Sequence, residues 1–174
     1  RVGTNQTLSL FYALNAVGGT RAVTMTFSGA IKPNRVQASI SEFFNIAASS
    51  AADGSAGASS TSPVSTGSFT PTTSGDLIYH CGVDDASPGS YNGSTIVAGS
   101  GFTLLHADRQ VGTAAQYQVQ ATAGPVSPSF TVGSDRWDSV AIALKSAAAG
   151  TAPSAGIRIV HVQHSLLAWT DNSG

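Results

Sequence analysis

Apolar and polar side chains alternate along the chain with the period of a β-strand. Within residues 7–14, one parity is wholly apolar and consists of Leu8, Leu10, Tyr12 and Leu14. Because successive side chains of a strand point to opposite faces, this alternation predicts a strand with one face toward the core. Residues 21–28 and 35–41 alternate in the same way, with the inward sets Val23, Met25, Phe27 and Val36, Ala38, Ile40. Both are predicted as half-buried antiparallel strands.

Short runs rich in Val, Ile, Thr, Tyr and Phe continue toward the C-terminus, separated by clusters of Gly, Pro, Ser and Asn. None of these runs has helical periodicity. The remaining predicted strands are 77–83, 95–106, 114–122, 129–132, 137–145 and 157–163, with a weak strand near Ser68. Together they predict an all-β fold of roughly ten strands, a two-sheet antiparallel β-sandwich of the jelly-roll or Ig-like kind.

Two segments of small residues divide the chain. Residues 47–68 have almost no bulky apolar side chain, so burial cannot offset the entropy of ordering them, and we expect a flexible loop. Residues 147–156 are predicted as a linker. The chain is therefore divided into a β-sandwich domain at 1–146, the linker, and a separate strand segment at 157–174.

Charged residues make up only 10% of the chain, with 8 Lys and Arg against 9 Asp and Glu, whereas an ordinary soluble domain has about 25%. A net charge of −1 without basic runs excludes nucleic acid and anionic membrane surfaces as natural partners. No apolar stretch approaches the roughly 18 residues of a membrane-spanning helix. A polar surface of Ser, Thr, Asn, Gln and Gly is common in secreted bacterial proteins. We therefore expect an already processed, extracellular or cell-surface chain without membrane insertion.

Enzymatic chemistry has little support in the sequence. There is no G-x-S-x-G motif for a nucleophilic serine, and Glu42 is the only glutamate available for a pair of catalytic carboxylates. Cys81 lies in a strand-like run, where a buried, inert thiol is expected rather than a nucleophile. The sequence predicts no catalytic residues, no enzymatic activity and no cofactor other than a calcium ion.

The calcium prediction rests on two acidic turns, since calcium needs six to eight oxygen ligands. The candidate ligands are Asp84, Asp85, Asp135 and Asp138. Aspartate is also a common turn residue for purely structural reasons, and this alternative stays open. His161 and His164 are three positions apart, so in a strand they point to opposite faces and do not chelate one ion.

Exposed aromatic rings can stack on sugars, and two residues are candidates for this role. Trp137 has the parity opposite to Val140 and Ile142 at the start of its strand, and Tyr91 lies in a loop. A tryptophan near a strand end can instead cover the core. Three glutamines of alternate parity are expected to form an outward polar row: Gln116, Gln118 and Gln120.

The order of several phrases resembles a β-sandwich module found, often in tandem, in large secreted or surface proteins of bacteria. These phrases are LSLFYALNAVGGTRAVTMTFSG, SISEFFNI, TTSGDLIYHCGV, GSGFTLLHADR, AAQYQVQATAGPVSPSFTV and WDSVAIALK. In such modules a phrase similar to TDNSGN precedes the part that matches residue 1, whereas here TDNSG ends the chain. The resemblance implies a fold and a location but no reaction.

This displaced segment suggests a mode of assembly. Ile157 and Ile159 share one strand face, and Val160 and Val162 the other, as in a strand buried on both sides. We expect residues 157–174 to complete a sandwich by strand addition. The acceptor is either the next copy, which gives an open head-to-tail filament, or the same chain. The leading hypothesis is a non-catalytic structural or adhesive module whose partners are other copies or neighbouring modules. The alternative is a carbohydrate-binding module with a polysaccharide partner.

Overall fold

The computed structural model describes residues 7–16, 24–26, 37–85, 95–133, 136–148 and 152–162, with the backbone alone for 155–162. Within these ranges the chain forms strands, turns and extended segments but no helix, so the predicted all-β class is confirmed. None of the described residues builds a helix long and apolar enough to cross a membrane.

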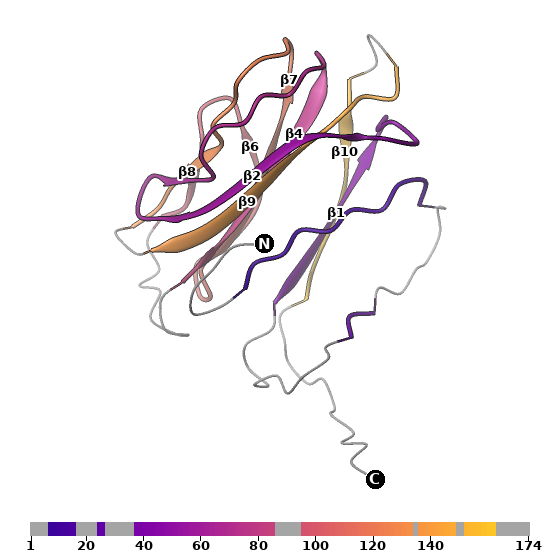
Figure 1. Cartoon of the computed structure of the whole chain (residues 1–174). Helices are drawn as coiled ribbons and strands as arrows, with labels where there is room; N and C mark the ends of the chain where they lie inside the picture. The colour runs from indigo at the N-terminus through magenta and orange to yellow at the C-terminus, as the bar shows by residue number, and fades with distance from the viewer. Residues whose placement is uncertain are drawn as a thin grey trace.

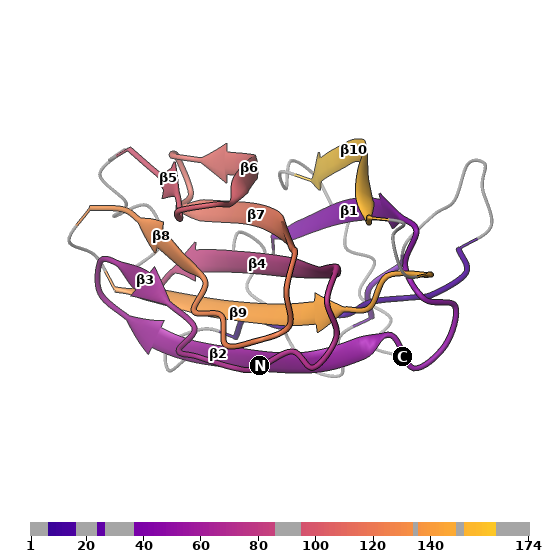
Figure 2. The same cartoon turned by 90° about the horizontal axis from the view of Figure 1, so that it is seen from above.

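A five-stranded antiparallel sheet forms the centre of the structure, with its strands side by side in the order β2-β9-β4-β7-β6 (Figure 2). Its members are β2 (Ala52–Ser60), β9 (Trp137–Leu144), β4 (Asp76–Asp84), β7 (Thr113–Gln120) and β6 (Thr103–Asp108). The bulky alternating runs of the sequence supply β4, β7 and β9, and all eight residues of β9 are buried. These predicted strands are confirmed.

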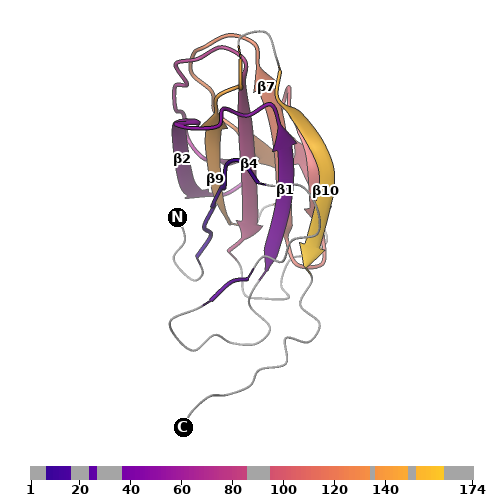
Figure 3. The ribbon, with the colours of Figure 1, turned by 90° about the vertical axis from the view of Figure 1, so that its right-hand side faces the viewer.

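Two smaller antiparallel sheets accompany it (Figure 1). The first has the order β3-β8-β5 and consists of β3 (Val64–Ser65), β8 (Ser129–Thr131) and β5 (Val97–Ala98). The second pairs β1 (Ala38–Phe44) with β10 (Ser154–Val162), which lie side by side in Figure 3. The strand predicted at 95–106 is thus split between β5 and β6, because the chain turns at Gly99 to Gly101.

Both faces of the five-stranded sheet bear apolar side chains, since alternate residues of β4 point to opposite sides. The side that carries Leu77, called here the Leu77 face, packs against Phe43 of β1 and against the extended residues 7–16 through Leu10 and Leu14. The opposite side, called here the Ile78 face, packs against the β3-β8-β5 sheet. The apolar cluster on this side consists of Val64, Ile96, Ala114, Phe130, Val132 and Trp137. The core therefore lies in two layers, one on each side of the sheet.

The predicted flexible loop at 47–68 is wrong for half of its length, because β2 and β3 lie within it. β2 pairs with β9 from Ala52↔Leu144 to Ser60↔Trp137. The small side chains of β2 bury little apolar surface, so its strand structure depends on main-chain hydrogen bonds to β9. The same small side chains allow neighbouring segments to lie close to β2. A register shift between Ala52 and Ser55 marks a β-bulge, where Gly54 adopts φ +124°.

Gly54 is a position where alanine should be poorly tolerated. A Cβ added there would lie 3.1 Å from Phe69 Cδ2, at a backbone angle that L-residues rarely adopt. We expect Gly54→Ala to lower the free energy of unfolding, measured in urea, by about 1–3 kcal/mol. Gly67→Ala is the control, because Gly67 shares the positive φ but nothing lies within 4 Å of its added Cβ. Equal losses in the two variants would show that contact with Phe69 is unimportant.

The N-terminal predictions need correction. Residues 7–14 do not form a strand beyond a single bridge residue at Leu8, and residues 24–26 of the predicted 21–28 strand are not in a strand either. Tyr12 and Met25, both predicted inward, are exposed. In β1, Ile40 is also exposed because a register shift between Ile40 and Glu42 reverses the parity, so that Phe43 points inward instead.

The C-terminal strand was predicted at 157–163, and β10 covers Ser154–Val162. It therefore begins inside the predicted linker, 147–156. It pairs with β1 of its own chain from Ala38↔Val162 to Phe44↔Ser154. Whether residues 147–156 separate a domain at 1–146 from a unit at 157–174 stays a prediction.

Candidate functional site

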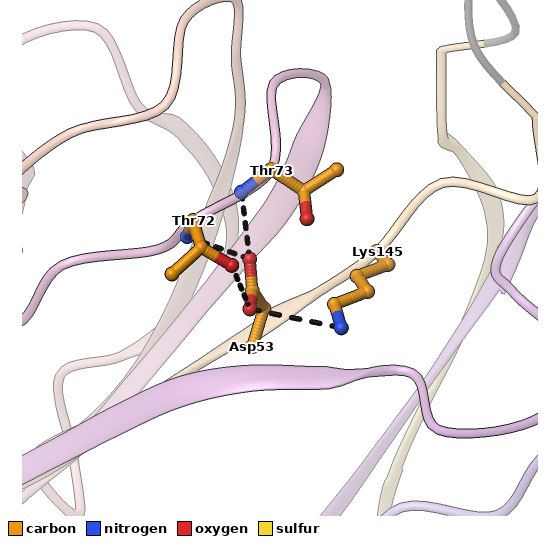
Figure 4. Close-up of polar contacts among 4 residues, drawn as sticks. All are labelled: Asp53, Thr72, Thr73 and Lys145. Carbon is orange, nitrogen blue, oxygen red and sulfur yellow. Dashed lines mark hydrogen bonds and ion pairs between the residues drawn. The ribbon is translucent and has the colours of Figure 1, made fainter.

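A cluster of polar residues surrounds Asp53, at the bulged start of β2 (Figure 4). Its carboxylate accepts hydrogen bonds from the Thr72 backbone N–H at 2.7 Å, the Thr72 hydroxyl at 2.8 Å and the Thr73 N–H at 2.9 Å. Lys145 Nζ lies 3.8 Å from Asp53 Oδ1, just beyond the end of β9. Asp53 thus holds the turn before β4 against β2 and β9.

Asp76, the first residue of β4, is the second carboxyl group of this cluster. It is fully buried, and no donor among the described residues reaches either of its oxygens. Burial raises the pKa of Asp76 to about 6, and the hydrogen-bonded carboxylate of Asp53 adds to this rise while Lys145 opposes it.

Burial also acts to raise the pKa of Asp53, but the hydrogen bonds from Thr72 and Thr73 outweigh it and hold that pKa well below its usual range. The two carboxyl groups therefore have very different proton affinities. A proton taken up by this pair near pH 6 therefore binds to Asp76 rather than to Asp53.

The sequence analysis missed this site. Asp53 lies in the small-residue segment that was predicted as a loop, and Asp76 follows a Thr-Thr-Ser-Gly turn. The one signal in the sequence is the run of turn residues before the strand, since the free backbone N–H groups of a turn often bind a carboxylate.

A second buried polar group lies between the Ile78 face and the β3-β8-β5 sheet. Gln116 of β7 is fully buried, and its amide nitrogen donates to His80 Nδ1 and to the Ser129 carbonyl, both at 2.8 Å. Its amide oxygen accepts the Gly99 N–H at 2.9 Å. Gln116 therefore connects β4, β8 and the turn after β5.

The predicted outward row of glutamines is thus wrong for Gln116, and Gln118 and Gln120 are only half-buried. The face of β7 that carries these glutamines points toward the β3-β8-β5 sheet rather than toward solvent. His80 stacks on Phe130 with a centroid distance of 4.3 Å. Burial lowers the pKa of His80 to about 3, so this ring is neutral and serves packing rather than proton transfer at neutral pH.

The calcium candidates do not form a site among the described residues. Asp85 pairs with Arg136 at 3.3 Å, and Asp138 accepts a hydrogen bond from the Ser59 hydroxyl. Asp84 lies opposite Trp137 in the β4–β9 register, on the face opposite to Asp138. No group of three or more His, Cys, Asp or Glu able to hold a metal occurs in the described ranges. Asp135 lies outside them.

Of the two candidates for stacking on sugars, only Trp137 lies within the described residues. Trp137 is fully buried in the cluster on the Ile78 face, so its prediction as an exposed sugar-binding ring is wrong, and it covers the core instead. Tyr91 lies outside the described residues, as does His164. Burial raises the pKa of the Cys81 thiol to about 12, in accord with the inert thiol expected there.

The four assembly residues lie in β10, whose backbone pairs with β1: Ile157, Ile159, Val160 and Val162.

Comparison of the chain with protein-family models, curated proteins and solved structures finds no match.

Proposed function

We propose that this chain is a non-catalytic structural or adhesive module of an extracellular bacterial assembly. In this proposal its sheets close into a sandwich of roughly ten strands, and β10 is the strand through which copies join. The observation that carries it is the pairing of β1 and β10 with each other in a separate two-stranded sheet. Such a strand can leave without breaking the ladder of the five-stranded sheet.

The chemistry of the described polar side chains supports a structural role. Asp53 and Gln116 connect separate elements, and Asp85 and Asp138 each contact a neighbouring side chain. The low charge of the chain supports an extracellular setting. The proposal includes no catalytic residue and no nucleic-acid partner.

Strand donation would keep the pairing that the chain makes with itself. A β10 from another copy would lie along β1 with the same register, Ser39↔His161 among its pairs. Donation in one direction gives an open filament, because the two surfaces differ.

Disulfide capture tests which chain supplies β10. One full-length chain carries Ser39→Cys and a second carries His161→Cys, both with Cys81→Ala to remove the native thiol. We expect a disulfide between the two chains after they are unfolded, mixed and refolded, because Ser39 and His161 are register partners. The control pairs His161→Cys with Ser55→Cys on β2, which is not its partner.

Sedimentation of the unmodified chain over a wide concentration range completes the test. Association that rises with concentration supports strand donation. A monomer at every concentration, together with a disulfide only inside a chain that carries both cysteines, would contradict it and leave β10 as an internal strand.

The carbohydrate-binding alternative has lost Trp137, the ring on which it chiefly rested. Saturable binding to a polysaccharide that disappears in Tyr91→Ala would revive it.

A further inference from the structure

The hydrogen-bond donors around the Asp53–Asp76 pair contact only Asp53. Asp53 faces three donors from the turn and the ammonium of Lys145. Asp76 faces the carboxylate of Asp53 from β2 and the more distant charge of Lys145, while its β7 partner in the register is the neutral Gln120. One lysine therefore serves two carboxyl groups, and the buried one has no donor of its own.

We propose that Asp53 and Asp76 form a proton-operated latch that holds the turn at residues 71–75 against the start of β2 and the end of β9. With one proton present, the Asp76 O–H donates to the Asp53 carboxylate. When this proton passes to water, two negative charges face each other in a buried place with Lys145 as their only described counter-charge. This inference goes beyond the proposed function and does not depend on strand donation.

The turn is the element that should respond. The amide groups of Thr72 and Thr73 are attached to Asp53, and Gly75 N–H donates to the Gln120 carbonyl at 2.8 Å. On the other side of Asp53, Lys145 N–H donates to the Ala51 carbonyl at 2.8 Å. Repulsion at Asp76 therefore acts on the joint between the turn, β2 and β9.

The direction of the pH effect follows from the two pKa shifts. The pKa of Asp76 is raised in the folded chain, so its contribution to stability is complete below about pH 4 and is lost as the pH rises through about 6. The pKa of Asp53 is lowered, so its contribution is complete above about pH 4 and is lost only in stronger acid. Of these two carboxyl groups, only Asp76 changes its protonation state between pH 5 and pH 8. The lowered pKa of His80 adds a separate contribution, which makes the folded chain more stable as the pH rises from 5 toward 6.5.

Urea unfolding of the full chain at pH 5 and pH 8 measures this effect. We expect the ratio of the wild-type to the Asp76→Asn folding equilibrium constant to fall by up to about tenfold between these values, because the histidines contribute equally to both chains. The amide proton shifts of Thr72 and Thr73 in the wild-type chain should change with a midpoint near the pKa of Asp76. Asp76→Asn retains a donor toward Asp53 but cannot ionise, so its profile should contain the contribution of the histidines alone. Glu42→Gln, which alters an exposed carboxylate on β1, should retain the wild-type profile.

Three results would overturn the latch: a wild-type profile parallel to that of Asp76→Asn, amide shifts of Thr72 and Thr73 that still change near pH 6 in Asp76→Asn, or a Glu42→Gln profile parallel to that of Asp76→Asn. Should Asp76→Asn fail to fold, carboxyl carbon shifts of the wild-type chain decide the matter. A single aspartate that titrates near pH 6, and that titrates lower in Asp53→Asn, supports the latch. If all the aspartates have titrated below pH 5, the latch does not exist.

Discussion

Replacement of Trp137 by alanine should lower the free energy of unfolding by about 3–5 kcal/mol, the largest effect expected from a single side chain here. Trp137 is fully buried on the Ile78 face, in one cluster with Val64 and Phe130. Its loss leaves a cavity between two sheets, which close packing cannot readily fill. Urea denaturation followed by circular dichroism measures the change.

Phe11→Ala is the matched control, because Phe11 is 89% exposed and its truncation should change the stability by less than about 0.5 kcal/mol. A small effect of Trp137→Ala, close to that of the control, would mean that the β3-β8-β5 sheet does not pack on β9 as described.

The second large effect is expected for Gln116→Leu, with a loss of about 2–4 kcal/mol. Leucine has a similar volume, but it leaves the Gly99 N–H, the Ser129 carbonyl and His80 Nδ1 without the partner that Gln116 supplies. Each buried polar group left unpaired costs about 1–3 kcal/mol, and relaxation of the turn recovers part of this. Urea denaturation again gives the difference.

Gln118→Leu, in the same strand and on the same face, provides the comparison. Gln118 is only half-buried, and a change below about 1 kcal/mol is expected. If both variants lost the same stability, the network around Gln116 would have no special part in joining the sheets.

The sequence allowed prediction of those strands whose side chains alternate and are bulky. β4 and β9 carry Ile, Leu and Val, so their hydrophobic pattern alone identifies them. β2 has only Ala, Gly and Ser beside Asp53, and its strand structure depends on main-chain pairing with β9, which no local pattern contains. Residues 7–14 show the opposite case, because Leu10 and Leu14 pack against the core from an extended segment whose one strand-type residue is the bridge residue Leu8.

The polar clusters were beyond prediction for a related reason. Whether Gln116 faces water or a second sheet depends on where β8 lies, and the sequence does not give that position. The same holds for Asp76, whose burial and contact with Asp53 result from the approach of β2. Trp137 has the parity that was predicted, but that parity leads into a covered face.

The order in which the strands enter the sheets has a consequence for biosynthesis. The Ser59 hydroxyl donates a hydrogen bond to Asp138 across β2 and β9, although the two residues are 79 positions apart. β1 pairs with β10, which lies still nearer the C-terminus. Such distant contacts slow folding, because a long loop must close before any pairing energy is gained. While the ribosome is still adding residues, the edges of β2 and β1 have no partner strand. The weakly hydrophobic composition of β2 then limits the adhesion of nascent chains to one another.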